Sequence, residues 1–191
     1  MIKEVRNNSE QIAPLREESR LIEGYAIVFD TESTGIAGFT EIIDRNALED
    51  VISKSDVLCL LDHNLNRGVL ARCNKGEGSL VLEIDDKGLK YTFEAPNTSL
   101  GDELLEGIRR GDISTSSFAF TVEKDTWSKR SDGSYLRTIN KINQLFDVSP
   151  VYRAAYDSTS VKADVRGLDE LKAKEKEELN NYYKELRNKL K

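Results

Sequence analysis

Short runs of apolar and β-branched residues, separated by turns of hairpin length, constrain the fold of this chain more than any other feature. They amount to about eight or nine strands, with two short helical stretches between them. The candidate segments, not all of which are expected to form separate strands, are at most a short strand at Ile2–Val5, then Leu21–Phe29, Phe39–Ile43, Asp56–Leu61, Gly68–Arg72, Ser79–Ile84, Leu89–Ala95, one within Gly111–Phe120, two that flank a loop within Val122–Asn140, and Leu145–Val151. Strands and helices do not alternate as they do in doubly wound folds. The pattern therefore predicts an α+β protein, mainly β, built as an antiparallel β-barrel or sandwich with short helices packed outside.

Two stretches predict the helices, and turn residues mark one hairpin and one long loop. The first helix is expected at Asp44–Ser53, begun by an N-capping Asp or Asn. The second is expected at Leu100–Arg109, with a capping Thr or Ser before it and a glycine after it. The residues Asp85–Gly88 are typical of a hairpin turn, with Gly88 at the position expected to need a positive φ. The hydrophilic stretch Asp125–Gly133 is expected to be a loop.

Composition divides the chain into three parts. Residues 1–19 are polar and are expected to form a loose arm, whereas residues 20–163 carry most of the predicted strands and are expected to form one domain. Residues 164–191 are dominated by charged residues and predict an amphipathic helical tail. Its apolar residues at helical spacing are Leu179, Tyr183, Leu186 and Leu190. Both a segment that docks on a partner and a solvated tail fit this pattern.

Charge and hydropathy argue against several classes of partner. The chain has 28 Lys and Arg against 34 Asp and Glu, a formal net charge of −6, so no basic surface favours nucleic acid. No run approaches the roughly 18 apolar residues of a membrane span, and the N-terminal residues lack the apolar stretch of a signal peptide. We therefore expect a soluble protein in a cytoplasm, with Cys59 and Cys73 reduced.

The stretch Gly111–Phe120, GDISTSSFAF, is the strongest candidate for a functional site. In a strand, successive side chains point to opposite faces, so Ser116 and Phe118 share one face and Ser117 lies on the other. The face with the phenylalanines should pack on the core. The opposite face carries small groups and leaves space for a ligand, so Ser117 is preferred to Ser114 and Ser116 as a nucleophile.

A serine hydroxyl is a weak nucleophile until a base takes its proton. His63, which follows a predicted buried strand, is the sole imidazole of the chain and the side chain best suited to that task near neutral pH. The alternative is a histidine that only hydrogen-bonds its loop, beside a serine that is only a small polar residue of a strand.

Asp147 lies in an apolar strand, LFDVSPV, where an unpaired carboxylate is costly. An imidazole N–H is a natural partner, because the carboxylate would orient the ring and stabilise its positive charge. Contact with water or with an arginine such as Arg137 is the alternative.

Two other kinds of site are weaker fits. Cys59, His63 and Cys73 match no common zinc spacing and lack a fourth ligand, so neither a metal nor any other cofactor is expected. A thiol hydrolase using Cys59 is disfavoured, since an apolar environment raises the thiol pKa and makes the group inert.

Several segments together resemble the tailed-bacteriophage prohead maturation protease family. They are EGYAIVFD at 23–30, FTEIIDRNAL at 39–48, LLDHN at 60–64, GVLAR at 68–72, GLKYTFEAPNTSLGDEL at 88–104, GDISTSSFAFTV at 111–122, RTI at 137–139 and LFDVSPVYRAAY at 145–156. They occur in order over roughly residues 20–162, and although each is weak alone, the set is specific.

The resemblance implies a serine endopeptidase with the fold of the herpesvirus assembly protease, a β-barrel surrounded by helices, over residues 20–163. The family's catalytic histidine then corresponds to His63, its nucleophile to Ser117 and its third member to Asp147, where the family often has Glu. Backbone N–H groups, with Arg137 nearby, are candidates to stabilise the oxyanion.

The resemblance also implies the biological setting. The substrate and partner would be the scaffold region of the major capsid protein, together with the chain itself, with the portal and self-association as further candidates. The site of action would be the host cytoplasm, inside the immature capsid. A catalytically inactive scaffold or capsid-assembly module of the same fold is the alternative.

Overall fold

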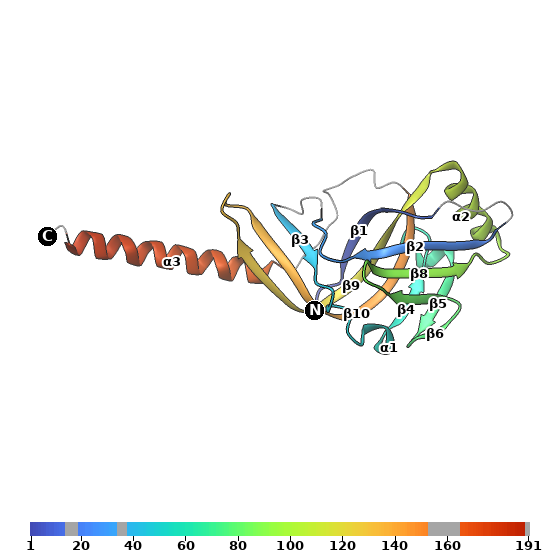
Figure 1. The fold of residues 1–191 in the computed structure, drawn as a ribbon, viewed down its shortest axis with the longest axis horizontal. Coiled ribbons are helices and arrows are strands. Elements are labelled where there is room, and N and C mark those ends of the chain that lie inside the picture. The colour runs from blue at the N-terminus through green and yellow to red at the C-terminus, as the bar shows by residue number, and fades with distance from the viewer. Residues whose placement is uncertain (14–18, 34–37, 153–164, 190–191) are drawn as a thin grey trace.

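Two long antiparallel strands, β9 (Ile113–Lys129) and β10 (Tyr135–Tyr152), form the centre of the fold (Figure 1). The structure is a computed structural model that describes residues 1–13, 19–33, 38–152 and 165–189. On its other side, β9 pairs antiparallel with β1 (Glu4–Gln11). β10 pairs in parallel, first with β3 (Phe39–Ile43) and further along with β4 (Asp56–Cys59). The sheet is completed by β5 and β6, which are Ala71–Asn74 and Glu77–Gly78.

A second, three-stranded sheet has the order β2-β8-β7. Its strands are Leu21–Val28 (β2), Gly88–Glu94 (β8) and Val81–Ile84 (β7), and both pairings are antiparallel. The main hydrophobic core draws on both sheets, with Ile22 and Phe93 from the second sheet and Phe118 and Phe120 from the first. Burial of these side chains holds the two sheets together.

The prediction of an α+β protein rich in strands is confirmed, but the predicted antiparallel barrel is wrong. In the described part of the chain, the strands form two sheets that do not close on themselves. The seven-stranded sheet is also mixed, because β10 takes two parallel neighbours. Such pairings join segments far apart in sequence, so strand-length patterns alone do not predict them.

In the described residues, three α-helices and a 3₁₀ turn accompany the sheets. Helix α2 (Ser99–Arg110) matches the prediction, with the Thr98 hydroxyl accepting a hydrogen bond from the backbone and Gly111 closing it at φ 80°. The helix expected at 44–53 is shortened to α1 (Val51–Lys54), because residues 44–50 form successive turns and Asp50 adopts φ 59°. The 3₁₀ turn, η1 (Leu65–Arg67), follows β4.

Three further expectations about local structure are corrected. Gly88 does not adopt a positive φ; a side chain there is excluded because a Cβ atom would lie 1.9 Å from the Ile27 carbonyl oxygen. Much of the stretch expected as a loop, Asp125–Gly133, is strand, since β9 continues to pair with β10 up to Lys129. The polar N-terminal segment is not loose over Glu4–Gln11, which forms β1.

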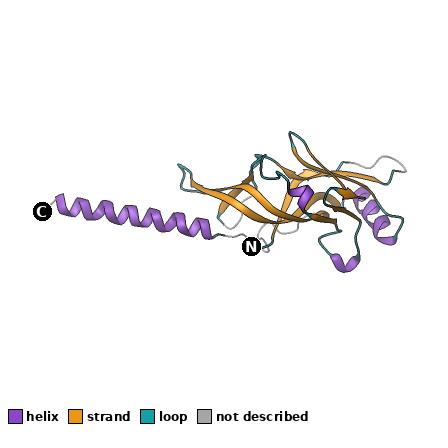
Figure 2. Ribbon diagram, turned by 90° about the horizontal axis from the view of Figure 1, so that it is seen from below, coloured by secondary structure: helices purple, strands orange, loops and turns teal. Residues whose placement is uncertain are grey.

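Helix α3 (Arg166–Lys189) extends away from the sheets, as the two views in Figures 1 and 2 show. Its first turns rest on the sheet, where Leu168 packs with Phe39 and Trp127 in a small separate cluster. Farther along, Leu179, Tyr182 and Tyr183 are exposed. Among the described residues, no helix combines the length and the apolar character needed to cross a membrane.

Candidate active site

Ser117 lies in β9 between two neighbouring strands, directly opposite Asn7 of β1 and Ser149 of β10. The alternation expected along β9 is present. Ser116 is on the core side, where its hydroxyl lies 2.8 Å from the Tyr91 hydroxyl, and the rings of Phe118 and Phe120 stack there with centroids 5.0 Å apart. Ser117 points to the other face and is fully buried.

His63 reaches Ser117 from a tight turn after β4. Both Asp62 and His63 adopt left-handed conformations, with φ of 55° and 56°, which are unfavourable for residues other than glycine. The turn is held in place by the Asp62 N–H, which donates to the Pro150 carbonyl of β10 at 3.0 Å, and by Asn64, whose side chain caps η1. Backbone strain of this kind persists only where the surrounding structure enforces it, and it is concentrated at functional sites.

The three side chains proposed from the sequence lie in one hydrogen-bonded chain. His63 Nε2 is 2.6 Å from Ser117 Oγ, and His63 Nδ1 contacts Asp147 Oδ1. Asp147 is buried in β10, opposite Ala119 of β9, whereas 24% of the imidazole surface stays exposed. The aspartate side chain is therefore long enough to reach the ring from this strand, although the family that the sequence resembles often has Glu at this position.

Asp147 is held as a carboxylate. Burial by itself would raise its pKa, but the hydrogen bond and charge of His63, the Ser149 hydroxyl and the charge of Lys3 together bring the pKa below its ordinary value. The Ser149 hydroxyl donates to Asp147 Oδ1 at 2.8 Å, and Lys3 Nζ lies 3.6 Å from Oδ2. An anion beside Nδ1 favours the tautomer with its proton on Nδ1, which leaves Nε2 free to accept a proton.

The Ser117 hydroxyl has two acceptors for its single proton. Besides His63 Nε2, the carbonyl oxygen of Arg6 in β1 lies 2.8 Å from Ser117 Oγ and accepts its hydrogen bond. Attack on a substrate requires the proton to pass to His63 instead, so Arg6 competes with the base. The role of Arg6 could not be recognised from the sequence, because a backbone carbonyl leaves no side-chain signal and β1 has no alternating apolar pattern.

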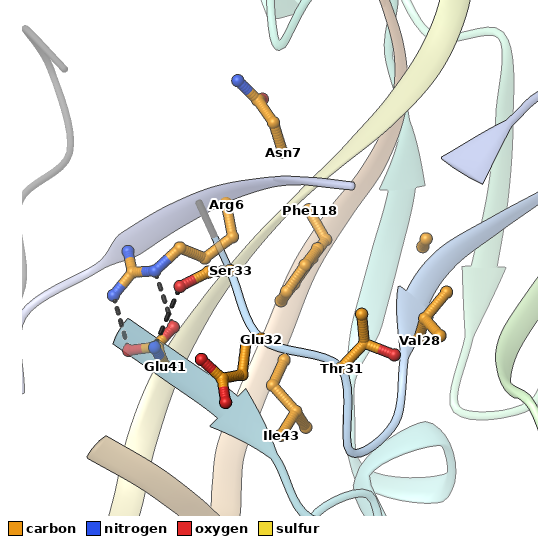
Figure 3. A pocket seen from close by; sticks show the side chains of 10 residues that line it. Arg6, Asn7, Val28, Thr31, Glu32, Ser33, Glu41, Ile43 and Phe118 are labelled. Carbon is orange, nitrogen blue, oxygen red and sulfur yellow. Dashed lines mark hydrogen bonds and ion pairs between the residues drawn. The ribbon is translucent and has the colours of Figure 1, made fainter. Parts of the chain in front are cut away.

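A buried ion cluster fixes the position of β1. It joins carboxylates and guanidinium groups from four strands, all with side chains that are nearly or fully inaccessible except that of Asp125. Its members are Glu4, Arg6, Glu41, Asp125 and Arg137. Figure 3 shows the Arg6 guanidinium directed at Glu41, beside a pocket of about 100 Å³ that Phe118 also lines. Arg6 and Phe118 are directly paired and alternate with Asn7 and Ser117 along their strands, so their side chains project to the face opposite to that of Ser117.

Arg137 is neither the partner of Asp147 nor placed to act at Ser117. Its Nη1 atom lies 2.7 Å from Glu4 Oε2, and its Nε atom lies 2.7 Å from Asp125 Oδ2. Burial opposes its charge, but these carboxylates outweigh that effect and raise the guanidinium pKa. The side chain is fully buried and its donors are engaged, so it is not a candidate for an oxyanion donor.

The alternative sites based on cysteine find little support. Cys59 and Cys73 are buried free thiols. Burial raises the Cys59 pKa well above its ordinary value, and the negative charge of Asp147 raises it further. In the part of the chain that the structure describes, no group of three or more His, Cys, Asp and Glu side chains is arranged to hold a metal ion.

Comparisons with known proteins identify a family for the chain. The model of a family described as Caudovirus prohead serine protease matches residues 4–174. A solved structure of the bacteriophage T4 capsid assembly protease, gp21, can be superimposed with a TM-score of 0.45 and 14% sequence identity, covering 80% of this chain and 96% of that one. No curated protein matches the chain.

Proposed function

The chain belongs to the Caudovirus prohead serine protease family, and we propose that it is a serine endopeptidase that cleaves the scaffold region of the major capsid protein, and itself, during capsid assembly. The observation that carries the proposal is the chain of contacts from Ser117 through His63 to Asp147. A base within hydrogen-bond reach of a nucleophile, oriented in turn by a buried carboxylate, is the arrangement that acyl transfer needs.

Each residue then has a defined role in the reaction. Ser117 Oγ attacks the scissile carbonyl carbon, its proton passes to His63 Nε2, and the carbonyl electron pair moves onto oxygen. When this intermediate collapses, the C–N bond breaks and His63 gives the proton to the leaving amine. Water, activated by His63, hydrolyses the acyl-enzyme by the same route. Asp147 orients the ring and stabilises its charge throughout.

Burial of the nucleophile suits an enzyme that has to be restrained before assembly. Ser117 is inaccessible and donates to the Arg6 carbonyl, so a substrate has to displace groups around it before attack. The small side chains on this face leave room for an extended peptide once it is uncovered. Action inside the immature capsid, in the host cytoplasm, would supply substrate at high local concentration.

The helical tail is proposed as the assembly segment. Its first turns dock on the sheet through Leu168, and Lys129 of β9 forms an ion pair with Glu175 at 2.8 Å. Beyond that contact, Leu179, Tyr182 and Tyr183 are exposed and suit contact with a capsid or scaffold partner.

The test is coexpression with the major capsid protein of the same phage, with products identified by mass spectrometry. Wild type and Cys59→Ala are expected to shorten the capsid protein, and Ser117→Ala is not. The matched control is Ser116→Ala, which removes a neighbouring buried hydroxyl on the other face of β9 and should retain cleavage. Absence of shortening by a folded wild type would favour an inactive assembly module instead, and loss only in Cys59→Ala would favour the thiol hydrolase.

A further inference from the structure

Asn7 of β1 lies opposite Ser117, the proposed nucleophile, which is in the neighbouring strand β9. It is the direct partner of Ser117 in the antiparallel pairing of β1 with β9. Directly opposite residues project to the same face of a sheet, with Cβ atoms about 4.5–5.5 Å apart. The adjacent Arg6 alternates to the other face, into the ion cluster. In Figure 3 the Asn7 side chain points away from Arg6 and Phe118, although Asn7 also borders the pocket that they line.

The Asn7 carboxamide makes no stabilising polar contact in the part of the protein that the structure describes. Its side chain is exposed, and no hydrogen bond or ion pair joins it to any other described residue. Each carboxamide has two N–H donors. An uncommitted donor therefore lies on the catalytic face, within one side-chain length of Ser117.

The usual oxyanion donors, backbone N–H groups near the nucleophile, are engaged here. β9 lies between β1 and β10, and residues 116–118 are paired with both neighbours. In a strand with a partner on each side, the amides are used in the two ladders and cannot also serve a substrate. Because Arg137 is also committed to the ion cluster, neither it nor the amides of residues 116–118 can serve, and a side chain on the Ser117 face is the candidate donor among the described residues.

We propose that Asn7 is a catalytic residue whose carboxamide N–H stabilises the oxyanion formed when Ser117 attacks a peptide carbonyl. This assignment rests on the proposed function. As the Ser117 Oγ–C bond forms and the hydroxyl proton passes to His63, the carbonyl electron pair becomes a negative charge on oxygen. The Asn7 N–H donates a hydrogen bond to that charge without transferring its proton. The bond strengthens in the transition state, so its contribution is to kcat rather than to substrate binding.

Steady-state kinetics on a peptide spanning the mapped cleavage site in the capsid protein test this role. Asn7→Ala is expected to lower kcat by about 10²–10³-fold with little change in KM. Asn7→Asp keeps the shape, removes both donors and places an anion near the oxyanion, so its kcat should fall at least as far. The control is Asn74→Ala, which removes an exposed carboxamide from β5, where Asn74 pairs with Asp56 rather than with β9. It should retain the wild-type kcat.

Thermal unfolding of each variant distinguishes a loss of catalysis from a loss of stability. Both Asn7 variants are expected to unfold at the wild-type transition temperature, because the Asn7 side chain is exposed and makes no hydrogen bond to a described residue. A normal kcat in Asn7→Ala, a loss confined to KM, or a loss of kcat that follows a lowered transition temperature in both Asn7 variants would overturn the assignment. Absence of cleavage by wild type would instead overturn the proposed function, so the two failures are distinguishable.

Discussion

The hydroxyl of Ser149 donates a hydrogen bond to Asp147 Oδ1, the same carboxylate oxygen that contacts His63 Nδ1. Ser149 lies two residues beyond Asp147 on the same face of β10 and directly opposite Ser117. One oxygen therefore links the strand that holds the carboxylate to the ring that faces the nucleophile. Since Ser149 is fully buried, the bond is shielded from competing water.

Replacement of Ser149 by Ala is expected to weaken both folding and catalysis. Hydrogen bonds to charged groups contribute about 1.5–3 kcal/mol, so the free energy of unfolding should fall by roughly that amount. A less constrained carboxylate should also lower kcat more than it raises KM. Urea unfolding and steady-state kinetics measure the two effects. Ser149→Thr keeps the hydroxyl in a strand-compatible residue and should restore much of kcat; equal losses in both variants would show that the hydroxyl is not what matters.

The lowered pKa of Asp147 makes a prediction about acid stability. A carboxyl group with a folded-state pKa below its unfolded value of about 3.9 stabilises the fold at higher pH and loses that effect as pH falls through the folded value. The difference in unfolding free energy between wild type and Asp147→Asn should thus be constant above about pH 5 and shrink toward more acidic pH. Urea unfolding of both proteins, from pH 6 down to the pH at which acid itself unfolds them, measures this difference in free energy. A difference that stays constant down to the most acidic pH at which the protein is folded would contradict the prediction.

The juxtaposition of Ser117, His63 and Asp147 could be predicted from sequence because its signals are local. Alternation along β9 separates Ser117 from Ser116 and Phe118, and a carboxylate in the apolar strand at Asp147 requires a partner. His63 connects these two local features, because it contacts both Ser117 and Asp147. Their roles in catalysis stay predictions until the variants are measured.

What sequence did not predict depends on long-range pairing. The barrel was expected from strand number, but closure depends on which strands pair, and β10 takes parallel partners from much earlier in the chain. Of β1, only Glu4 and Val5 fall within a predicted strand, and the rest was expected as a loose arm, because Glu4 and Arg6 have no apolar periodicity to indicate burial. Their charges are buried only because Glu41 and Arg137, distant in sequence, meet them.

The ion cluster predicts that β1 depends on Glu41. The Glu41 carboxylate accepts hydrogen bonds from Arg6 Nε at 2.7 Å and from Arg137 Nη1 at 2.9 Å. Glu41→Ala leaves buried guanidinium groups short of a partner, which should cost about 3–5 kcal/mol in the free energy of unfolding. Hydrogen exchange should then accelerate in β1, and kcat should change because the Arg6 carbonyl and Asn7 are both carried by that strand.

An exposed ion pair provides the comparison for Glu41. Arg45 and Asp30 are 3.1 Å apart with about half of each side chain exposed, so Arg45→Ala should leave unfolding and exchange in β1 nearly unchanged. Equal effects of Arg45→Ala and Glu41→Ala would show that the cluster does not hold β1.

The raised pKa of Cys59 predicts a thiol that is unreactive while the protein is folded. Because burial and the charge of Asp147 disfavour the thiolate, the folded state holds this proton more tightly than the unfolded state does. Its contribution to stability is therefore complete below the unfolded pKa of about 8.5 and is lost as pH rises from there toward the folded value. Iodoacetamide at neutral pH should leave Cys59 unmodified in the native protein and modify it in urea, as peptide mass mapping can show. Rapid modification of native Cys59, with loss of cleavage activity, would contradict this and revive the thiol as a nucleophile.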